Sequence, residues 1–373
     1  MCGFKVRHCL VFTLCVLSSL ISAAQEPAVS SEASYLSFQV PGSLGTYPMG
    51  INNSMAVTGY YYVTPMVTRG FLRNPDGTIT TFDVPGGVST EPVSINAAGD
   101  VTGIGLVGNI SFGFMRYADG RVVTFEDLPA PEQALPVSIN AFGEVAGVFQ
   151  GGPGGTTGFT RSRAGVFTTL EYPKGSFNAT TLTGLNDSGT AVGYFPVDSG
   201  AVSFITHPDG FSIQFVLPVD VGSNGTLTTA AQSVNADGAV AGWYSAAMSS
   251  QPGAITTTGG FVRSPQGMFT LFGPPGTIVT SRKPVFPLER GSLSNPPWLS
   301  INGQGSIAGS FTDTEAAQHG FVRNQDGTLT SFDPPRGGQT MATGINDSGV
   351  VAGYYFYDSN NQMAEGFLRL PKP

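Results

Sequence analysis

Seven copies of one motif run through this chain, and each consists of an apolar residue, an asparagine and a turn rich in small residues. The asparagines are Asn52, Asn96, Asn140, Asn186, Asn235, Asn302 and Asn346, at spacings of 44, 44, 46, 49, 67 and 44 residues. A phenylalanine after a small residue recurs in the same units, at Phe71, Phe114, Phe159, Phe204, Phe261, Phe321 and Phe367. A period of this length is typical of architectures in which every repeat is one supersecondary unit.

Each unit contains four short strand patterns. The unit that begins at Gly344 reads GINDSGVVAGYY and, after a loop, GFLR. The sixth unit shows the rest of the pattern after Gly320, GFVRNQDGTLTSFDPP, where an Asp-Gly turn separates two alternating strands. Asp-Gly between such strands is a strong hairpin signal, and four strands in about 44 residues is the size of a propeller blade. The sequence therefore predicts an all-β, seven-bladed β-propeller of four-stranded antiparallel blades.

The predicted domain organisation follows from this repeat. Residues 1–24 are expected to be a signal peptide, and residues 25–373 a single propeller domain. The repeats are placed near 49–92, 93–136, 137–182, 183–231, 232–298, 299–342 and 343–373, the last of these together with 35–42.

The N-terminal segment has a predicted place in the last repeat. Repeat seven stops after Phe367-Leu368-Arg369 and has no fourth strand pattern. Tyr35–Gly42 matches the fourth strand of the first repeat at a spacing of 44 residues, as in Pro41 and Pro85. We therefore expect the N-terminal strand to complete the last blade and close the ring, which would leave no open end to the array.

The start of the chain has the pattern of a secretion signal. Lys5, Arg7 and His8 precede an apolar run, Cys9–Leu20, and Ser22 and Ala24 are small residues suited to cleavage before Gln25. A retained anchor is the alternative. All three cysteines lie within this segment, so the mature chain is expected to have neither a disulfide nor thiol chemistry. The predicted localisation is secreted, either extracellular or periplasmic.

The charge of the chain disfavours some partners. Removing Lys5 and Arg7 with the signal changes the formal net charge from −8 to −10. An acidic surface repels nucleic acid and anionic membranes, so neither is an expected partner. No later segment is apolar enough to predict a membrane span, and we expect a monomer.

Several of these segments resemble the HAF-repeat family of bacterial extracellular proteins. The resemblance lies in GINDSGVVAGYY, in HGFVRNQDGTLTSFDPP and in FDVPGG at Phe82, and it covers nearly the whole chain after the signal. The His-Ala-Phe tripeptide appears only as His319-Gly320-Phe321, and other repeats have Arg69 or Glu365 at the histidine position. The resemblance implies secretion and a repeat fold, and it implies no particular activity.

Two sets of polar residues repeat with the motif. The seven asparagines could form a ring that binds an ion or a sugar, but each precedes a tight turn, which favours a hydrogen bond to its own backbone. Four of the repeated arginines have an acid ten residues later, at Asp83, Glu126, Glu171 and Asp333, which favours structural ion pairs over binding of phosphate or carboxylate. The repeated arginines are Arg73, Arg116, Arg161, Arg263, Arg323 and Arg369.

The longest insertion is the predicted ligand site. Connections of variable length all lie on one predicted face of the disc, where binding loops are expected on a rigid scaffold. The longest, 273–298, is basic and aromatic in an acidic protein, which suits an anionic or carbohydrate ligand. A tolerated insertion that packs over the channel is the alternative. Its candidate residues are Arg282, Lys283, Phe286, Arg290 and Trp298.

Catalysis receives little support from the sequence. His207 and His319 lie in different repeats, without metal-ligand spacing and without a nucleophile elbow. We therefore expect a non-catalytic binding module with an unknown ligand, either a glycan or a protein, and no metal or cofactor. The alternative is a carbohydrate-active hydrolase or lyase, which needs two carboxylates converging on one face.

Overall fold

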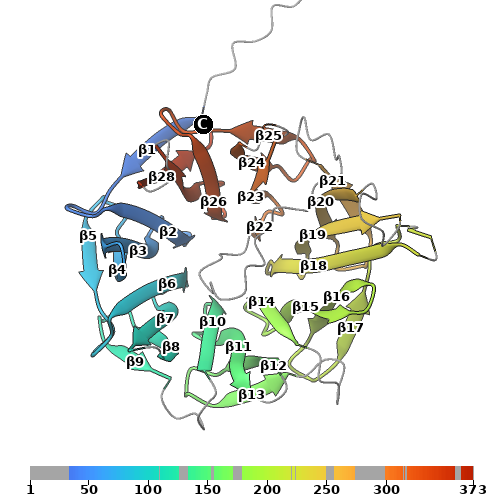
Figure 1. Cartoon of the computed structure of the whole chain (residues 1–373), viewed down its shortest axis with the longest axis horizontal. Helices are drawn as coiled ribbons and strands as arrows, with labels where there is room; N and C mark the ends of the chain where they lie inside the picture. Colours follow the sequence, from blue (N-terminus) through green and yellow to red (C-terminus); the bar gives the residue numbers. More distant parts are fainter. Residues whose placement is uncertain are drawn as a thin grey trace, which may run out of the picture.

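The computed structural model describes residues 33–108, 110–125, 133–152, 155–170, 179–219, 221–222, 224–248, 256–273, 299–313, 315, 317–357 and 363–372. The described chain contains 28 β-strands and no helix. Five sheets have four strands each, and the sixth has eight. The sheets stand around a common centre as in a β-propeller, so the predicted all-β class and the four-stranded antiparallel units are confirmed (Figure 1).

We number the four-stranded groups one to seven in chain order. The innermost strands are β2 (Gly45–Ile51), β6 (Ser89–Ile95), β10 (Gln133–Ile139), β14 (Thr181–Leu185), β18 (Thr226–Val234), β22 (Leu299–Ile301) and β26 (Gln339–Ile345). The second strands are β3 (Val57–Thr64), β7 (Val101–Val107), β11 (Val145–Gly152), β15 (Ala191–Val197), β19 (Val240–Ala247), β23 (Ile307–Thr312) and β27 (Val351–Phe356). The third strands are β4 (Val67–Arg73), β8 (Ile110–Arg116), β12 (Gly155–Arg161), β16 (Gly200–Thr206), β20 (Thr256–Arg263), β24 (Gln318–Arg323) and β28 (Ala364–Leu370). The outer strands are β5 (Ile79–Phe82), β9 (Val122–Thr124), β13 (Phe167–Leu170), β17 (Ser212–Phe215), β21 (Phe269–Phe272), β25 (Leu329–Phe332) and β1 (Ser34–Phe38).

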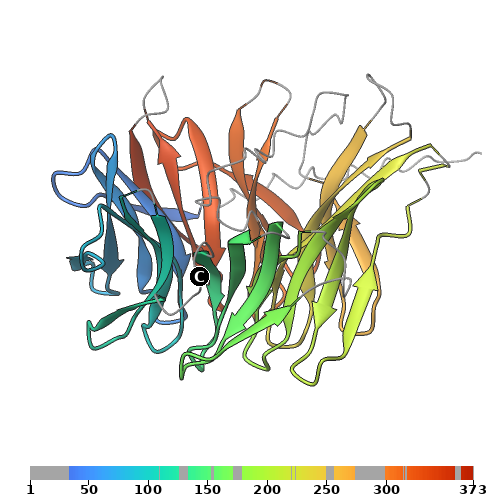
Figure 2. The same ribbon diagram turned by 60° about the horizontal axis from the view of Figure 1, so that its bottom comes forward.

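The connections define two faces of the molecule. The turns between first and second strands, such as 52–56, and between third and fourth strands, such as 74–78, lie on one side, which we name the turn face. The second-to-third connections, such as 65–66, and those between consecutive sheets, such as 83–88, lie on the opposite side, which we name the loop face. Figure 2 views these ends from the side.

The N-terminal strand lies where the phase of the repeat predicted it. β1 pairs antiparallel with β28, in a register that joins Tyr35 to Arg369 and Phe38 to Gly366. The last sheet therefore has the strand order β1-β28-β27-β26, and its outer strand comes from the opposite end of the chain.

Groups four and five differ from the others because they are joined. The start of β16 pairs parallel with β18 at Gly200–Leu227 and Ala201–Thr228, which makes one eight-stranded sheet. Gly200 has a φ of +137°, and a Cβ there would collide with the carbonyl of Leu227. Glycine is required at this junction because no other residue allows the two backbones to approach so closely.

The asparagine of each repeat makes hydrogen bonds in two directions. In Asn96, the side-chain oxygen accepts from the backbone nitrogens of Ala98 (3.1 Å) and Asp100 (2.9 Å), which closes its own turn. Its amide nitrogen donates to the carbonyl oxygen of Asn140, the equivalent residue of the next repeat, at 3.1 Å. The predicted turn role is therefore correct for the oxygen, while the nitrogen links neighbouring sheets.

The same link recurs in every repeat. Six further bonds of 2.9–3.2 Å join Asn52 to Asn96, Asn140 to Asn186, Asn186 to Asn235, Asn235 to Asn302, Asn302 to Asn346 and Asn346 to Asn52. All seven side chains are buried. Because their donors and acceptors are used internally, they do not form an open ring for an ion or a sugar.

The prediction that the repeated arginines pair with an acid ten residues later is wrong for Arg73 and Arg323, because Asp83 pairs with Arg69 and Asp333 with His319. The other two predicted acids, Glu126 and Glu171, lie outside the described residues. Arg323 places its guanidinium carbon 5.4 Å from the ring centre of Phe272, at the end of the preceding outer strand, while Asp333 bonds to other residues. In five more repeats the guanidinium carbon lies 4.3–5.2 Å from the ring centre of the equivalent phenylalanine. These pairs are Arg73–Phe38, Arg116–Phe82, Arg161–Phe125, Arg263–Phe215 and Arg369–Phe332. The arginines therefore connect neighbouring sheets by cation–π contacts near the outer rim.

This pairing also explains the repeat that lacks the arginine. The equivalent residue in group four is Thr206, and the residue that would face it at the end of the preceding outer strand is Leu170 rather than phenylalanine. Thr206 instead accepts a hydrogen bond from Ser212 within its own sheet. Group four thus lacks both the cation and the aromatic ring, as expected if the two residues stabilise the fold mainly through their mutual contact.

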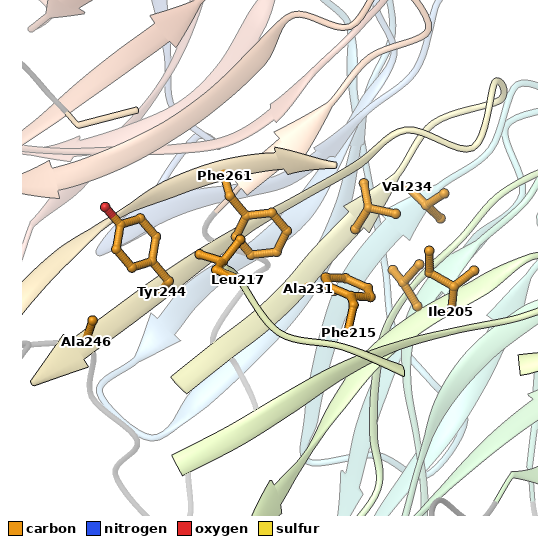
Figure 3. Close-up of a cluster of buried hydrophobic side chains, with 10 residues drawn as sticks. Ile205, Phe215, Leu217, Ala231, Val234, Tyr244, Ala246 and Phe261 are labelled. Atoms are coloured by element: carbon orange, nitrogen blue, oxygen red, sulfur yellow. The ribbon is translucent and has the colours of Figure 1, made fainter. Parts of the chain in front are cut away.

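The core lies between adjacent sheets. The seven repeated phenylalanines of the third strands are at most 2% exposed. One core cluster contains Phe215, Leu217 and Phe261, and it lies between groups four and five (Figure 3). The second strands have glycine where a Cβ would collide with the innermost strand; at Gly353 it would meet the Met341 carbonyl. The alternation of glycine and large side chains therefore allows the four strands to pack tightly.

The Arg323–Phe272 contact can be tested with a double-mutant cycle. We expect Arg323→Thr and Phe272→Leu, which copy the natural pair Thr206 and Leu170, to be coupled by about 0.5–2 kcal/mol in the free energy of unfolding, because either change alone removes the whole cation–π contact. Denaturant unfolding of the four proteins measures this coupling. A cycle of Arg323→Thr with Asp333→Asn is the control and should show none. Coupling to Asp333 but not to Phe272 would restore the ion-pair interpretation.

Candidate functional site

The residues of the predicted ligand loop, Arg282, Lys283, Phe286, Arg290 and Trp298, lie outside the described residues. The same face carries other side chains that could meet a ligand.

The central channel is narrow and lined by the innermost strands. Its volume is about 170 Å³, below the 300–1,000 Å³ of usual ligand pockets, and its lining includes Ser94, Ser138 and Ser300. The hydroxyl of Ser233, another lining residue, accepts a hydrogen bond from the backbone nitrogen of Ile301 in the next group, at 2.9 Å. The hydroxyls of Ser94, Ser233 and Ser300 thus connect neighbouring groups, so the channel is a structural feature rather than the best candidate for a ligand site.

A group of aromatic side chains lies on the loop face between groups seven and one. We name it the tyrosine cluster, and it consists of Tyr47, Tyr60, Tyr62, Tyr354 and Phe356. Tyr47 stacks on Tyr60 with ring centres 5.0 Å apart and planes 8° apart, and Tyr354 meets the Tyr47 ring edge-on, also at 5.0 Å. Tyr47 and Tyr60 are buried, whereas Tyr62, Tyr354 and Phe356 are partly exposed. Two rings of the cluster are therefore buried, and the other three are partly accessible to solvent.

Glu91 is the charged residue beside this cluster. It lies on β6 of group two, and its Oε1 accepts a hydrogen bond of 3.1 Å from the hydroxyl of Thr68 on β4. Burial raises the pKa of Glu91, and no Lys, Arg or His of the described chain forms an ion pair with it. A buried carboxyl group with a raised pKa inside a cleft is characteristic of functional sites.

The tyrosines and Glu91 influence one another electrostatically. Burial raises the pKa of Tyr60, and the neighbouring Tyr354 and Glu91 raise it further. Burial and then Glu91 also raise the pKa of Tyr62. These hydroxyls therefore remain protonated at neutral pH and can donate hydrogen bonds.

Sequence analysis overlooked Glu91, although a signal was present. Glu91 occupies the position of Tyr47 in repeat one and of Leu135 in repeat three, each directly before a proline. Glu91 is the charged residue at a repeat position that is uncharged in the other six repeats. The tyrosine cluster was harder to find, because it joins residues from the first and last repeats.

A second polar group lies on the loop face of group six. Nδ1 of His319 is 2.7 Å from Oδ2 of Asp333, and its Nε2 is 3.2 Å from Oδ2 of Asp313. The other oxygen of Asp333 accepts from Thr340 at 2.7 Å. In group one, Arg69 takes the histidine position and forms an ion pair with Asp83 at 3.4 Å. The acid at the end of the outer strand thus pairs with a residue fourteen positions earlier.

The described chain offers neither a metal site built from His, Cys, Asp and Glu nor a membrane-spanning helix. No group of three His, Cys, Asp or Glu side chains there is arranged to hold a metal ion. Within the same residues, no helix has the length and apolar character needed to cross a membrane.

Solved structures similar to this chain include enzymes. Virginiamycin B lyase from Staphylococcus aureus has a TM-score of 0.58 and 13% identity over 91% of this chain and 100% of its own. A streptogramin B lyase has a TM-score of 0.55 and 14% identity over 91% and 98%. Puromycin hydrolase has a TM-score of 0.50 and 15% identity over 90% of this chain and 56% of its own. No protein-family model and no curated protein sequence matches the chain.

These similarities contradict the expectation that the protein is not an enzyme. Two lyases and a hydrolase share its fold over about nine tenths of its length. The identities of 13–15% show the common fold alone, and the substrates belong to those other proteins. The sequence argument failed because it required a catalytic motif, whereas function resides in sites placed on a fold.

His319 predicts a pH-dependent stability. Burial opposes its protonation, but hydrogen bonds to Asp333 and Asp313 outweigh burial and raise the pKa of His319. Its stabilising contribution is therefore fully present below the unfolded pKa of about 6.5 and is lost as pH rises through the higher folded value. We expect His319→Gln to lower the melting temperature more at pH 6 than at pH 9.

The matched control is Arg69→Gln at the equivalent position. A guanidinium keeps its charge over this range, so the loss of melting temperature should be the same at both pH values. An equal loss for His319→Gln at pH 6 and pH 9 would contradict the charged pairing.

Proposed function

We propose that the protein is a secreted propeller that binds an extracellular ligand on its loop face, at the tyrosine cluster and Glu91. The observation that carries this proposal is a partly exposed aromatic surface, formed by Tyr62, Tyr354 and Phe356, beside a carboxyl group that has no cationic partner in the part of the chain that the structure describes. Aromatic side chains supply large contact area at low entropic cost, and a few polar groups orient a ligand. The basic start of the chain and its apolar run support export.

Catalysis at the same place is the second candidate function. It is favoured by the raised pKa of Glu91, which suits a proton donor or acceptor in a lyase or hydrolase reaction. Lyases and a hydrolase share the fold, so a propeller of this kind can carry an active site, and this supports the second candidate by analogy. In such a reaction Glu91 would transfer the proton, and the protonated hydroxyl of Tyr62 would donate a hydrogen bond to the substrate.

The binding proposal is tested by a glycan array and a small-molecule thermal-shift screen of the purified protein. For a ligand found in this way, we expect Tyr62→Ala to weaken binding by about tenfold or more, because it removes an aromatic contact worth roughly 1–2 kcal/mol. Isothermal titration measures the change. Phe211→Ala removes an exposed aromatic side chain from the turn face and should leave affinity unchanged. Equal effects of the two variants would place the site elsewhere.

Glu91→Gln separates the two candidate functions. If the ligand is turned over, we expect kcat to fall by about 10²-fold or more while binding persists, because glutamine cannot transfer the proton. Product formation followed by mass spectrometry measures this. A substrate that is converted equally well by Glu91→Gln would remove Glu91 from the chemistry.

We also propose that the seven sheets form a closed ring. The support comes from the two ends of the chain: β1 pairs with β28, Arg73 stacks on Phe38, and Asn346 donates to Asn52. The first repeats the pairing of third and outer strands within the other sheets, and the other two repeat contacts made between consecutive sheets. Closure would hold the tyrosine cluster together, because that cluster combines residues of groups one and seven.

Deletion of residues 25–42 tests the closure. We expect the melting temperature to fall by more than about 5 °C, because the last sheet loses its outer strand and Arg73 loses its aromatic partner. Calorimetry measures the shift. A milder variant, Phe38→Leu, removes only the cation–π partner and should lower it less. An unchanged melting temperature after the deletion would refute the closed ring.

A further inference from the structure

An exposed apolar band borders the tyrosine cluster on the loop face. We name it the apolar rim, and it consists of Leu44, Val63, Met66, Val88, Val107 and Ile110. Met66 is 86% exposed and Ile110 is 64% exposed. These residues lie at strand ends and hairpin tips, where polar side chains are usual, and such a concentration of exposed apolar surface commonly marks a binding site.

Backbone pairing holds the apolar rim next to the site. The nitrogen of Leu44 donates to the carbonyl of Tyr62 at 2.9 Å, which brings Leu44 beside Val63. The nitrogen of Val88 donates to Leu106 at 2.6 Å in the equivalent position of group two. Tyr62 belongs to the tyrosine cluster and Val88 directly precedes β6, which carries Glu91, so the backbone places the apolar rim next to both the aromatic and the acidic parts of the site.

The charges around this surface are unbalanced. Arg69 is paired with Asp83, and Arg336 is paired with Glu365 at 2.9 Å. Glu91 has only the hydroxyl of Thr68 as a hydrogen-bond partner within the described chain. A carboxylate that is partly removed from water and has no cationic partner among the described residues favours a ligand that brings one.

We propose that the loop-face site binds an amphiphilic cation, whose protonated amine or quaternary ammonium group meets Glu91 and the faces of Tyr62 and Tyr354 while its apolar body covers the apolar rim. This inference rests on the proposed function and specifies its ligand class. Cations are attracted to tyrosine faces by the ring quadrupole, and the attraction is strongest where water is excluded. An anionic ligand would meet the uncompensated carboxylate and a net negative protein.

The test compares three probes with the same apolar chain and different head groups. They are decyltrimethylammonium, decyl maltoside and decyl sulfate, each below its critical micelle concentration and titrated by calorimetry into the full mature chain. We expect the cationic probe to bind at least about tenfold more tightly than either of the others. Equal affinities for the three probes would overturn the proposal.

Substitutions show which residues cause the preference for the cationic probe. Glu91→Gln should bring the affinity for the cationic probe to within about twofold of that for the maltoside, whereas Glu315→Gln, an exposed carboxylate on the same face, should preserve the preference. The double change Met66→Ser with Ile110→Ser should weaken all three probes alike, since it removes only apolar contact. A cationic preference that survives Glu91→Gln would overturn the assignment.

The outcomes also separate this inference from the proposed function. If the three probes bind equally and the Met66 and Ile110 changes weaken each of them, the binding face stands and the cationic class fails. If no variant alters the binding of any probe, both fail. If the wild-type chain sediments as a dimer that the Met66 and Ile110 changes dissociate, the apolar rim seats a second copy, and the amphiphile proposal is overturned.

Discussion

The structure depends on one hydrogen-bonded residue that is used seven times. Each asparagine satisfies two needs with one amide group, since its oxygen closes the turn below its own strand and its nitrogen donates to the carbonyl of the next asparagine. A carbonyl at the turn of one sheet is thereby placed at a fixed distance from the preceding sheet. The angle between neighbouring sheets is set by this bond near the axis, where a small change would be amplified at the rim.

The outer rim uses a different interaction for the same purpose. Between each pair of sheets with an arginine, the guanidinium crosses to the phenylalanine that ends the preceding outer strand. Neighbouring sheets are therefore joined twice, by the asparagine bond near the axis and by the arginine–phenylalanine contact near the rim. The loop-face ends take no part in either contact, so they can vary in sequence without loss of the fold. This is why residues as different as Tyr47, Glu91 and Leu135 occupy one repeat position.

Most of the fold could be predicted from the sequence because it repeats. The period predicted the four-strand units, and the phase match of Tyr35–Gly42 predicted the partner of β28. Partners in neighbouring repeats were misassigned: Asp333 lies in the same repeat as Arg323, whereas the true partner Phe272 lies in the previous one. The tyrosine cluster was missed for a related reason, since Tyr47 and Tyr354 are brought together only by the arrangement of the first and last sheets.

The pairing of β1 with β28 means that the last sheet can be completed only near the end of synthesis. Among the described strands, Ser34–Phe38 is synthesised first and its partner Ala364–Leu370 last. The backbone groups of Ser34–Phe38 therefore have no strand partner until Ala364–Leu370 has been synthesised. Such distant pairing is slow to form, and an unpaired strand is exposed to pairing with other chains in the meantime. A truncated or stalled chain therefore presents two open edges at once, that of the free N-terminal strand and that of the unfinished sheet, which gives quality-control proteases and chaperones a means of recognising incomplete molecules.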